Sequence, residues 1–199
     1  MRAILSVSDR EGIVELAKGL TEAGVECYAT DGTRAHLAEA GVVVRAVSEL
    51  TDAPEILGGR VKTLHPTIFA ALLARRDQPD HLAQLAEHGI EQLDMVVVNL
   101  YPFGQTATQA DTTLDQALEQ IDIGGVALLR AAAKNFPGVA AVSDPTQYAS
   151  VIRDIKSQGT VSPETRQKLA AEAFALTAAY DAQIASYLYT QSGTLFPSR

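Results

Sequence analysis

Short apolar runs alternate with segments of helical periodicity along most of the chain. Four runs are typical of buried strands, because they are short, apolar and bounded by polar or glycine-containing turns. They span Arg2–Val7, Val25–Ala29, Asp94–Asn99 and Val139–Val142, and Val42–Val44 begins a further strand. Strands that alternate with helices predict an α/β fold with a mainly parallel sheet.

Helical spacing of apolar residues predicts the elements between these strands. The first helix follows Ser8 and Asp9, either of which can cap it. Further helices are expected over Arg34–Glu39, after a turn at Thr30–Thr33, over Pro79–His88, and from Ser162 to about Tyr189. The last of these is rich in alanine, which indicates close packing. We therefore predict one domain over residues 1–190, with residues 191–199 as a tail or truncated linker.

Composition and charge narrow the class of protein. The chain has 199 residues and a net charge of −8, which argues against a general nucleic-acid binder, because such proteins need a positive field. No apolar stretch approaches the roughly 20 residues of a membrane span. Cys27 is the only cysteine, so no internal disulfide can form. These features lead us to expect a cytoplasmic protein whose ligand is a small molecule, with no nucleic acid or membrane partner.

The segment Glu55-Ile-Leu-Gly-Gly-Arg-Val-Lys-Thr-Leu-His-Pro66 is the most informative loop in the sequence. Its two glycines allow positive φ angles or close approach of the backbone to a ligand. Arg60, Lys62, Thr63 and His65 then present cations and hydrogen-bond donors within six residues. This composition predicts a binding loop for an anionic ligand, although His65 could equally hold the loop by hydrogen bonding.

Polar residues also follow three of the predicted strands at their carboxyl ends, where ligands bind in parallel sheets. They are Ser8, Asp9 and Arg10 after the first strand, Thr30, Gly32 and Thr33 after the second, and Asn99 and Tyr101 after the buried strand at 94–99. The first amides of a helix lack internal partners and bind anions, so the first two groups predict a phosphate pocket. The alternative is a plain helix cap at Ser8 and Asp9 and a structural role for Tyr101.

The turn Ile121-Asp-Ile-Gly-Gly-Val126 leads into an apolar helix that carries Arg130 and Lys134. A lysine is not expected on a segment built of alanine, which favours a chemical role for Lys134 and for the carboxylate of Asp122. The alternative for Asp122 is a helix N-cap. No group of residues has metal-ligand spacing, and the chain has no Walker A, GxGxxG or GxSxG motif.

Taken together, these segments resemble the inosine monophosphate (IMP) cyclohydrolase domain, which precedes an AICAR transformylase domain in the bifunctional purine-biosynthesis enzyme. The matching pieces occur in order and cover the chain except its tail; they are Ser6-Val-Ser-Asp9, Leu57-Gly-Gly-Arg-Val-Lys-Thr-Leu-His-Pro66, Ala74-Arg-Arg-Asp77, Asn99-Leu-Tyr-Pro-Phe103, Ile121-Asp-Ile-Gly-Gly-Val126 and Leu129-Arg-Ala-Ala-Ala-Lys-Asn135. The resemblance implies a methylglyoxal-synthase-like fold, a three-layer sandwich with a central, mainly parallel sheet. It also implies ring closure of formyl-AICAR (FAICAR) to IMP, the last step of de novo purine biosynthesis, without cofactor or metal.

The resemblance further implies a set of site residues. Asp122, with Tyr101, would take up or relay a proton, and Lys62, supported by Lys134, would stabilise an oxyanion. The substrate would be held by Ser8, Asp9, Arg10, Thr30, Gly32, Thr33, Arg60, Thr63, Asn99, Ile123 and Gly124. The resemblance also implies a homodimer and a transformylase partner domain or protein.

Two segments depart from the family pattern. Residues 67–71, Thr-Ile-Phe-Ala-Ala, stand where the family has a lysine and a His-Gly-Gly run, and Asp31 stands in a turn that is usually Gly-Gly. Two other functions stay open at this point. A non-catalytic effector-binding domain of the same fold would need the phosphate turns but not Asp122 or Lys134. A methylglyoxal synthase would rely on carboxylates near the phosphate site, where Asp31 lies.

Overall fold

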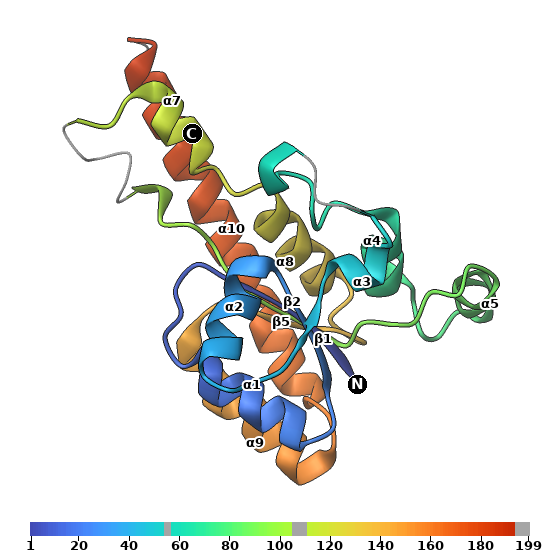
Figure 1. Ribbon diagram of the computed structural model, residues 1–199. Coiled ribbons are helices and arrows are strands. Elements are labelled where there is room, and N and C mark those ends of the chain that lie inside the picture. The colour runs from blue at the N-terminus through green and yellow to red at the C-terminus, as the bar shows by residue number, and fades with distance from the viewer. Residues whose placement is uncertain (54–56, 105–110, 194–199) are drawn as a thin grey trace.

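The computed structural model describes residues 1–53, 57–104 and 111–193. At its centre is a five-stranded, all-parallel sheet in the order β3-β2-β1-β4-β5 (Figure 1). The strands are β1 (Arg2–Val7), β2 (Glu26–Ala29), β3 (Arg45–Ala46), β4 (Met95–Asn99) and β5 (Ala140–Val142). The predicted α/β fold with a parallel sheet is therefore confirmed.

Helices cover both faces of this sheet (Figure 1). They are α1 (Ile13–Glu22), α2 (Asp31–Glu39), α3 (Ser48–Thr51), α4 (Pro66–Leu73), α5 (Pro79–Glu87), α7 (Leu114–Glu119), α8 (Gly124–Lys134), α9 (Tyr148–Gln158) and α10 (Pro163–Gln191), with 3-10 turns η1 (Leu57–Gly59) and η2 (Pro145–Gln147). Ile4 and Leu5 are adjacent in β1 and belong to opposite layers of the core, as the alternation of a strand requires. Leu5 packs with α1 and α9, whereas Ile4 packs with α4 and α8.

The long C-terminal helix α10 begins where the sequence predicts. Ser162 caps it by accepting a hydrogen bond from Thr165 N, and the helix is 29 residues long, or about 43 Å. Its N-terminal half packs against β5 and α8, and its C-terminal half extends beyond the sheet beside α7 (Figure 1). The helix includes Gln191, which was expected in the tail, and residues 194–199 lie outside the described residues. No helix in the described ranges is long and apolar enough to cross a membrane.

The start of α1 differs from the prediction. Neither Ser8 nor Asp9 caps this helix, which begins at Ile13. Its N-cap residue is Gly12, which has a φ of 65° and no side chain to bond to the helix. The reason is that a loop of several residues separates β1 from α1, and Asn99 of β4 binds Ser8 and Asp9 within that loop. The expected cap at Ser8 or Asp9 is therefore wrong.

Two other boundaries also moved. Helix α2 begins at Asp31, three residues earlier than expected, because Thr30 is the N-cap residue and the predicted turn forms the first turn of the helix. The third strand is Arg45–Ala46 rather than Val42–Val44, since Arg45 pairs with Tyr28 of β2 and the side chain of Val43 is 89% exposed. An isolated valine run does not specify which residues meet the sheet edge.

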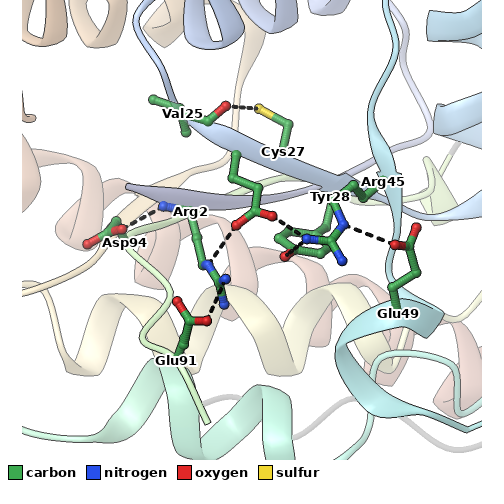
Figure 2. A network of polar contacts seen from close by, with 9 residues as sticks. Arg2, Val25, Cys27, Tyr28, Arg45, Glu49, Glu91 and Asp94 are labelled. Atoms are coloured by element: carbon green, nitrogen blue, oxygen red, sulfur yellow. Dashed lines mark hydrogen bonds and ion pairs between the residues drawn. The ribbon is translucent and has the colours of Figure 1, made fainter. Parts of the chain in front are cut away.

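A network of ion pairs joins β1, β2 and β3 (Figure 2). The guanidinium of Arg2 lies 2.8 Å from Glu26, and its backbone amide donates to Asp94 at 2.6 Å. Arg45 pairs with Glu26 and donates to the hydroxyl of Tyr28 at 3.0 Å. Each exposed pair contributes little stability alone, but together the pairs join β1, β2 and β3 at the edge of the sheet where β1 begins. The opposite, carboxyl edge is left for the loops that carry the candidate site residues.

Candidate functional site

The loop after β1 is organised by Asn99, the last residue of β4. Asn99 Oδ1 accepts hydrogen bonds from Ser8 N at 2.6 Å and Asp9 N at 2.9 Å, and its Nδ2 donates to Asp9 O at 2.8 Å. The hydroxyl of Ser8 lies 3.0 Å from the carbonyl oxygen of Leu100, which accepts from it. The Asn99 carboxamide therefore positions the backbone of this loop.

Thr30 and Thr33 are buried where β2 turns into α2. Thr33 Oγ1 accepts a hydrogen bond from Val7 N at 3.0 Å, and the residue is only 2% exposed. Its side chain thus joins α2 to β1 and does not face solvent. The first backbone amides of α2, those of Asp31, Gly32 and Thr33, have no partner within the helix and are the groups suited to an anion.

The glycine-containing loop adopts the backbone that its sequence predicts. Leu57, Gly58 and Gly59 have φ angles of 53°, 61° and 86°. Further along the loop, Thr63 is buried, and a Cβ at Gly124 would lie 2.6 Å from Thr63 Oγ1. The loop therefore packs directly against the N-terminus of α8, and a side chain at position 124 would fit only if Thr63 shifted. Residues 55 and 56, which begin the predicted loop, lie outside the described residues.

The exit of this loop is structural. His65 is the N-cap residue of α4, and its Nδ1 accepts a hydrogen bond from Thr67 N at 3.3 Å. Residues 67–71, which depart from the family pattern, lie in α4, where Ile68 and Ala71 are buried in the core. The apolar substitution in this segment therefore serves core packing.

Lys62 acts electrostatically on Asp122, although the two residues are sixty positions apart in the sequence. Burial raises the pKa of Asp122, while the N–H of Gly125 and the ammonium of Lys62 act in the opposite direction on that pKa. Asp122 Oδ1 accepts a hydrogen bond from Gly125 N at 2.6 Å, in the first turn of α8. The N-cap residue of α8 is Ile123, so the alternative interpretation of Asp122 as the N-cap residue is wrong by one position. The Asp122 carboxylate binds the first turn of α8 and lies within electrostatic reach of Lys62.

Several of the candidate residues line three hollows near the carboxyl edge of the sheet. The first, of about 460 Å³, is lined by Thr30, Asp31, Lys62 and His65 among others. A second, of about 590 Å³, runs along α8 and includes Asp122, Ile123 and Lys134. The third, of about 610 Å³, includes Ser8, Asp9, Asn99 and Tyr101. Lys62 lines the first hollow and Asp122 the second, and the ammonium of Lys62 acts electrostatically on the Asp122 carboxylate.

Three of the expected cations lie apart from this pair. Arg60 forms an exposed ion pair with Glu119 of α7. Lys134 is exposed at the C-terminal end of α8, about 15 Å along the helix from Gly124. Arg10 is exposed, and its guanidinium makes no hydrogen bond or ion pair with the described residues. Lys62 therefore acts on Asp122 at the start of α8, whereas Lys134 lies at the other end of that helix.

Sequence reasoning missed Tyr180 of α10. The hydroxyl of Tyr180 accepts a hydrogen bond from Asp122 N at 2.9 Å and donates to Gln120 O at 3.1 Å. A tyrosine in an alanine-rich helix is a weak signal, and no spacing in the sequence points from residue 180 to residue 122.

Other chemistry finds little support among the described residues. They contain no group of three or more His, Cys, Asp or Glu side chains placed to hold a metal ion. Cys27 is buried, and burial raises the pKa of its thiol to about 12, which makes it a poor nucleophile. The groups best suited to chemistry are therefore the carboxylate of Asp122 and the ammonium of Lys62.

Two models of known protein families match this chain. The family model for the MGS-like domain matches residues 12–127, which is more than half of the chain. This chain belongs to the MGS-like domain family. A second model, described as AICARFT/IMPCHase bienzyme, matches residues 132–199. The resemblance noted in the sequence is thereby confirmed, as is the methylglyoxal-synthase-like fold.

Similar proteins extend the match over the whole chain. The bifunctional purine biosynthesis protein PurH of Chloroflexus aurantiacus is 56% identical over 191 residues, covering 96% of this chain and 37% of that protein. PurH of Listeria monocytogenes is 50% identical over 198 residues, covering 100% and 39%. The chain thus spans about two fifths of the length of these curated relatives. The crystal structure of ForH superposes with a TM-score of 0.83 at 39% identity, covering 94% of this MGS-like chain and 98% of that one.

The role of Asn99 can be tested by unfolding in urea. Asn99→Ala removes the partners of Ser8 N, Asp9 N and Asp9 O, so we expect the free energy of unfolding to fall by about 2 kcal/mol. Tyr101→Phe is the control on the same segment, because the Tyr101 ring is 52% exposed, and it should change stability by less than about 0.5 kcal/mol. Equal urea midpoints for Asn99→Ala and the unmodified chain would contradict this assignment.

Proposed function

We propose that this MGS-like domain is an IMP cyclohydrolase, which closes the ring of formyl-AICAR to give IMP and water. The observation that carries the proposal is the half-buried carboxylate of Asp122 at the start of α8, which the ammonium of Lys62 reaches electrostatically. The match to the AICARFT/IMPCHase family and the identity to PurH proteins support the same function.

The reaction needs a base, because an amide nitrogen is a weak nucleophile. The carboxamide nitrogen of the substrate attacks the formyl carbon and loses a proton, and the formyl oxygen becomes a hydroxyl that later leaves as water. Asp122 is the candidate base, directly or through Tyr101. Burial raises the pKa of Asp122 and makes its carboxylate a stronger base than an exposed one.

The negative charge that develops on the formyl oxygen needs a partner. Lys62 supplies an ammonium group close to Asp122, so a substrate bound between them would meet the base and the cation together. Both reacting groups belong to one molecule, and holding them in an attack geometry supplies much of the rate. In this proposal Lys134 supports the substrate from the far end of the hollow along α8.

The 5′-phosphate and ribose would occupy the neighbouring hollow. Thr30, Asp31 and Lys62 line this hollow, and the first backbone amides of α2, those of Asp31, Gly32 and Thr33, would bind the phosphate from the adjoining helix end. Ser8, Asp9, Arg10, Asn99, Thr63, Ile123 and Gly124 complete the proposed contacts. Arg60 would join them by leaving Glu119, since an exposed ion pair is worth only about 0–1 kcal/mol.

The wider setting rests on the same proposal. The PurH relatives are bifunctional, so we propose a transformylase domain or protein as a partner, and a homodimer as the assembly. We propose residues 1–190 as the cyclohydrolase domain, residues 191–199 as a tail or linker, and the cytoplasm as the compartment. We propose that the reaction uses no metal or cofactor.

The direct test is turnover of formyl-AICAR. We expect the purified chain to convert formyl-AICAR to IMP in buffer containing a chelator, measured by the absorbance change of ring closure. The absence of turnover at micromolar enzyme would sink the proposal. IMP binding without turnover would instead support an effector-binding domain, and release of methylglyoxal from a triose phosphate would support a methylglyoxal synthase.

Substitution of the central pair should separate chemistry from folding. Lys62→Ala and Asp122→Asn should each lower kcat by about 100-fold or more, because each removes a group that acts in the transition state. Asp122→Asn keeps an oxygen for the Gly125 N–H and removes a charge that burial disfavours, so its melting temperature should be unchanged or higher. Lys18→Ala, an exposed change on α1, is the control with unaltered kinetics. Near-normal rates in both Lys62→Ala and Asp122→Asn would show that the site is misassigned.

The pH dependence of kcat/KM tests the raised pKa of Asp122. The base acts only when ionised, so kcat/KM should fall as the pH drops through the pKa of Asp122. Because burial raises that pKa, the midpoint of this acid limb should lie above the usual value for an aspartate. The measurement is a pH–rate profile of the unmodified chain and of Asp122→Asn. A limb that is unchanged in Asp122→Asn must belong to another group.

A further inference from the structure

We propose that Tyr180 is a positioning residue that fixes the Asp122 carboxylate from the distant helix α10. This inference rests on the proposed function, in which Asp122 is the base. Tyr180 lies fifty-eight residues after Asp122 in the sequence and contacts the backbone of the turn that carries it.

The contact clamps the turn on both sides of a single residue. The Tyr180 hydroxyl accepts a hydrogen bond from Asp122 N at 2.9 Å and donates one to Gln120 O at 3.1 Å. It therefore binds the acceptor just before Ile121 and the donor just after it. Tyr180 is only 5% exposed, and no described buried side-chain N or O atom lacks a partner. The hydroxyl thus fixes the backbone from which the carboxylate projects.

The ring of Tyr180 also reaches the segment that carries Tyr101. It packs edge-on against Phe103, with centroids 6.4 Å apart and an interplanar angle of 71°. Phe103 in turn donates its backbone N–H to Tyr101 O at 2.8 Å and is 1% exposed. One side chain of α10 therefore links the Asp122 turn with the loop after β4.

Two hydrogen bonds divide the work of placing Asp122. The bond from Gly125 N fixes one carboxylate oxygen to the start of α8, whereas the bond to Tyr180 fixes the backbone of Asp122 itself. If the second bond is lost, Asp122 N and Gln120 O need new partners, and the turn shifts to find them. A shift of about 1 Å at a catalytic group can cost up to 100-fold in rate.

The variant that isolates this contact is Tyr180→Phe, which keeps the ring against Phe103 and removes only the hydroxyl. We expect kcat for formyl-AICAR to fall by about 10-fold, with KM within about twofold of the unmodified value, because most of the proposed substrate contacts come from other segments of the chain. Tyr187→Phe is the matched control, since Tyr187 packs against the same Phe103 at 5.5 Å from the same helix. It should leave kcat unchanged. An unchanged kcat in Tyr180→Phe would overturn the proposal.

A double-mutant cycle tests whether Tyr180 acts through Asp122. In the Asp122→Asn background, Tyr180→Phe should lower kcat by less than about twofold, because the base that it positions is already gone. A full 10-fold loss in that background would assign Tyr180 to general folding and contradict the inference. The cycle needs only the residual rate of Asp122→Asn, measured at high enzyme concentration.

Amide hydrogen exchange gives a readout that does not depend on activity. The Asp122 amide should exchange at least about 10-fold faster in Tyr180→Phe than in Tyr187→Phe, since its acceptor has been removed. Unchanged exchange would refute the clamp even if kcat fell. If the unmodified chain shows no turnover, the proposed function fails, and the exchange rates still decide whether Tyr180 holds the turn.

Discussion

Parallel pairing of β1 with β2 and β4 is the constraint on which the rest of this structure depends. Because these strands run the same way, Val7, Ala29 and Asn99 end at one edge, and the chain must leave each strand through a loop or helix there. The backbone groups at that edge need partners. Asn99 supplies them for the loop after β1, and Thr33 supplies one for Val7 N. Polar side chains are therefore needed to bind the backbone at this edge, and the candidate site lies at the same edge.

The sequence predicts β1, β2, β4 and β5 well because their burial leaves a clear pattern of apolar residues. Residues 95–98 of β4 are at most 1% exposed, and the corresponding run in the sequence is wholly apolar. The start of α1 was predicted wrongly for a physical reason. Ser8 has the side chain of a helix cap, but its amide and hydroxyl bind Asn99 and Leu100, which lie ninety residues away. Capping is a local preference, and a long-range contact overrode it at this position.

The candidate site also has features that the sequence predicts and features that only the tertiary structure shows. Residues 57–65 are recognisable in the sequence by their adjacent glycines and cations, and the positive φ angles of Gly58 and Gly59 agree with that interpretation. The packing of Thr63 against Gly124 is a tertiary contact that no spacing encodes, and no spacing encodes the electrostatic effect of Lys62 on Asp122. Lys134 shows the converse limit, since helix geometry places it a full helix length away from the carboxylate with which the sequence motif groups it.

The role of a base that we propose for Asp122 has two opposing requirements, and the surroundings of Asp122 address both. The carboxylate must be basic, which burial achieves by raising the pKa, and it must stay ionised, which the Gly125 N–H and Lys62 favour by acting against that rise. The hydrogen bond from the Gly125 N–H uses only one carboxylate oxygen, Oδ1. Tyr180 binds the backbone instead, so it can hold the turn without occupying the second oxygen or adding charge. Anchoring a base through its own amide leaves the reactive atom available, and a hydrogen bond to the carboxylate from the same hydroxyl would lower the pKa that burial raises.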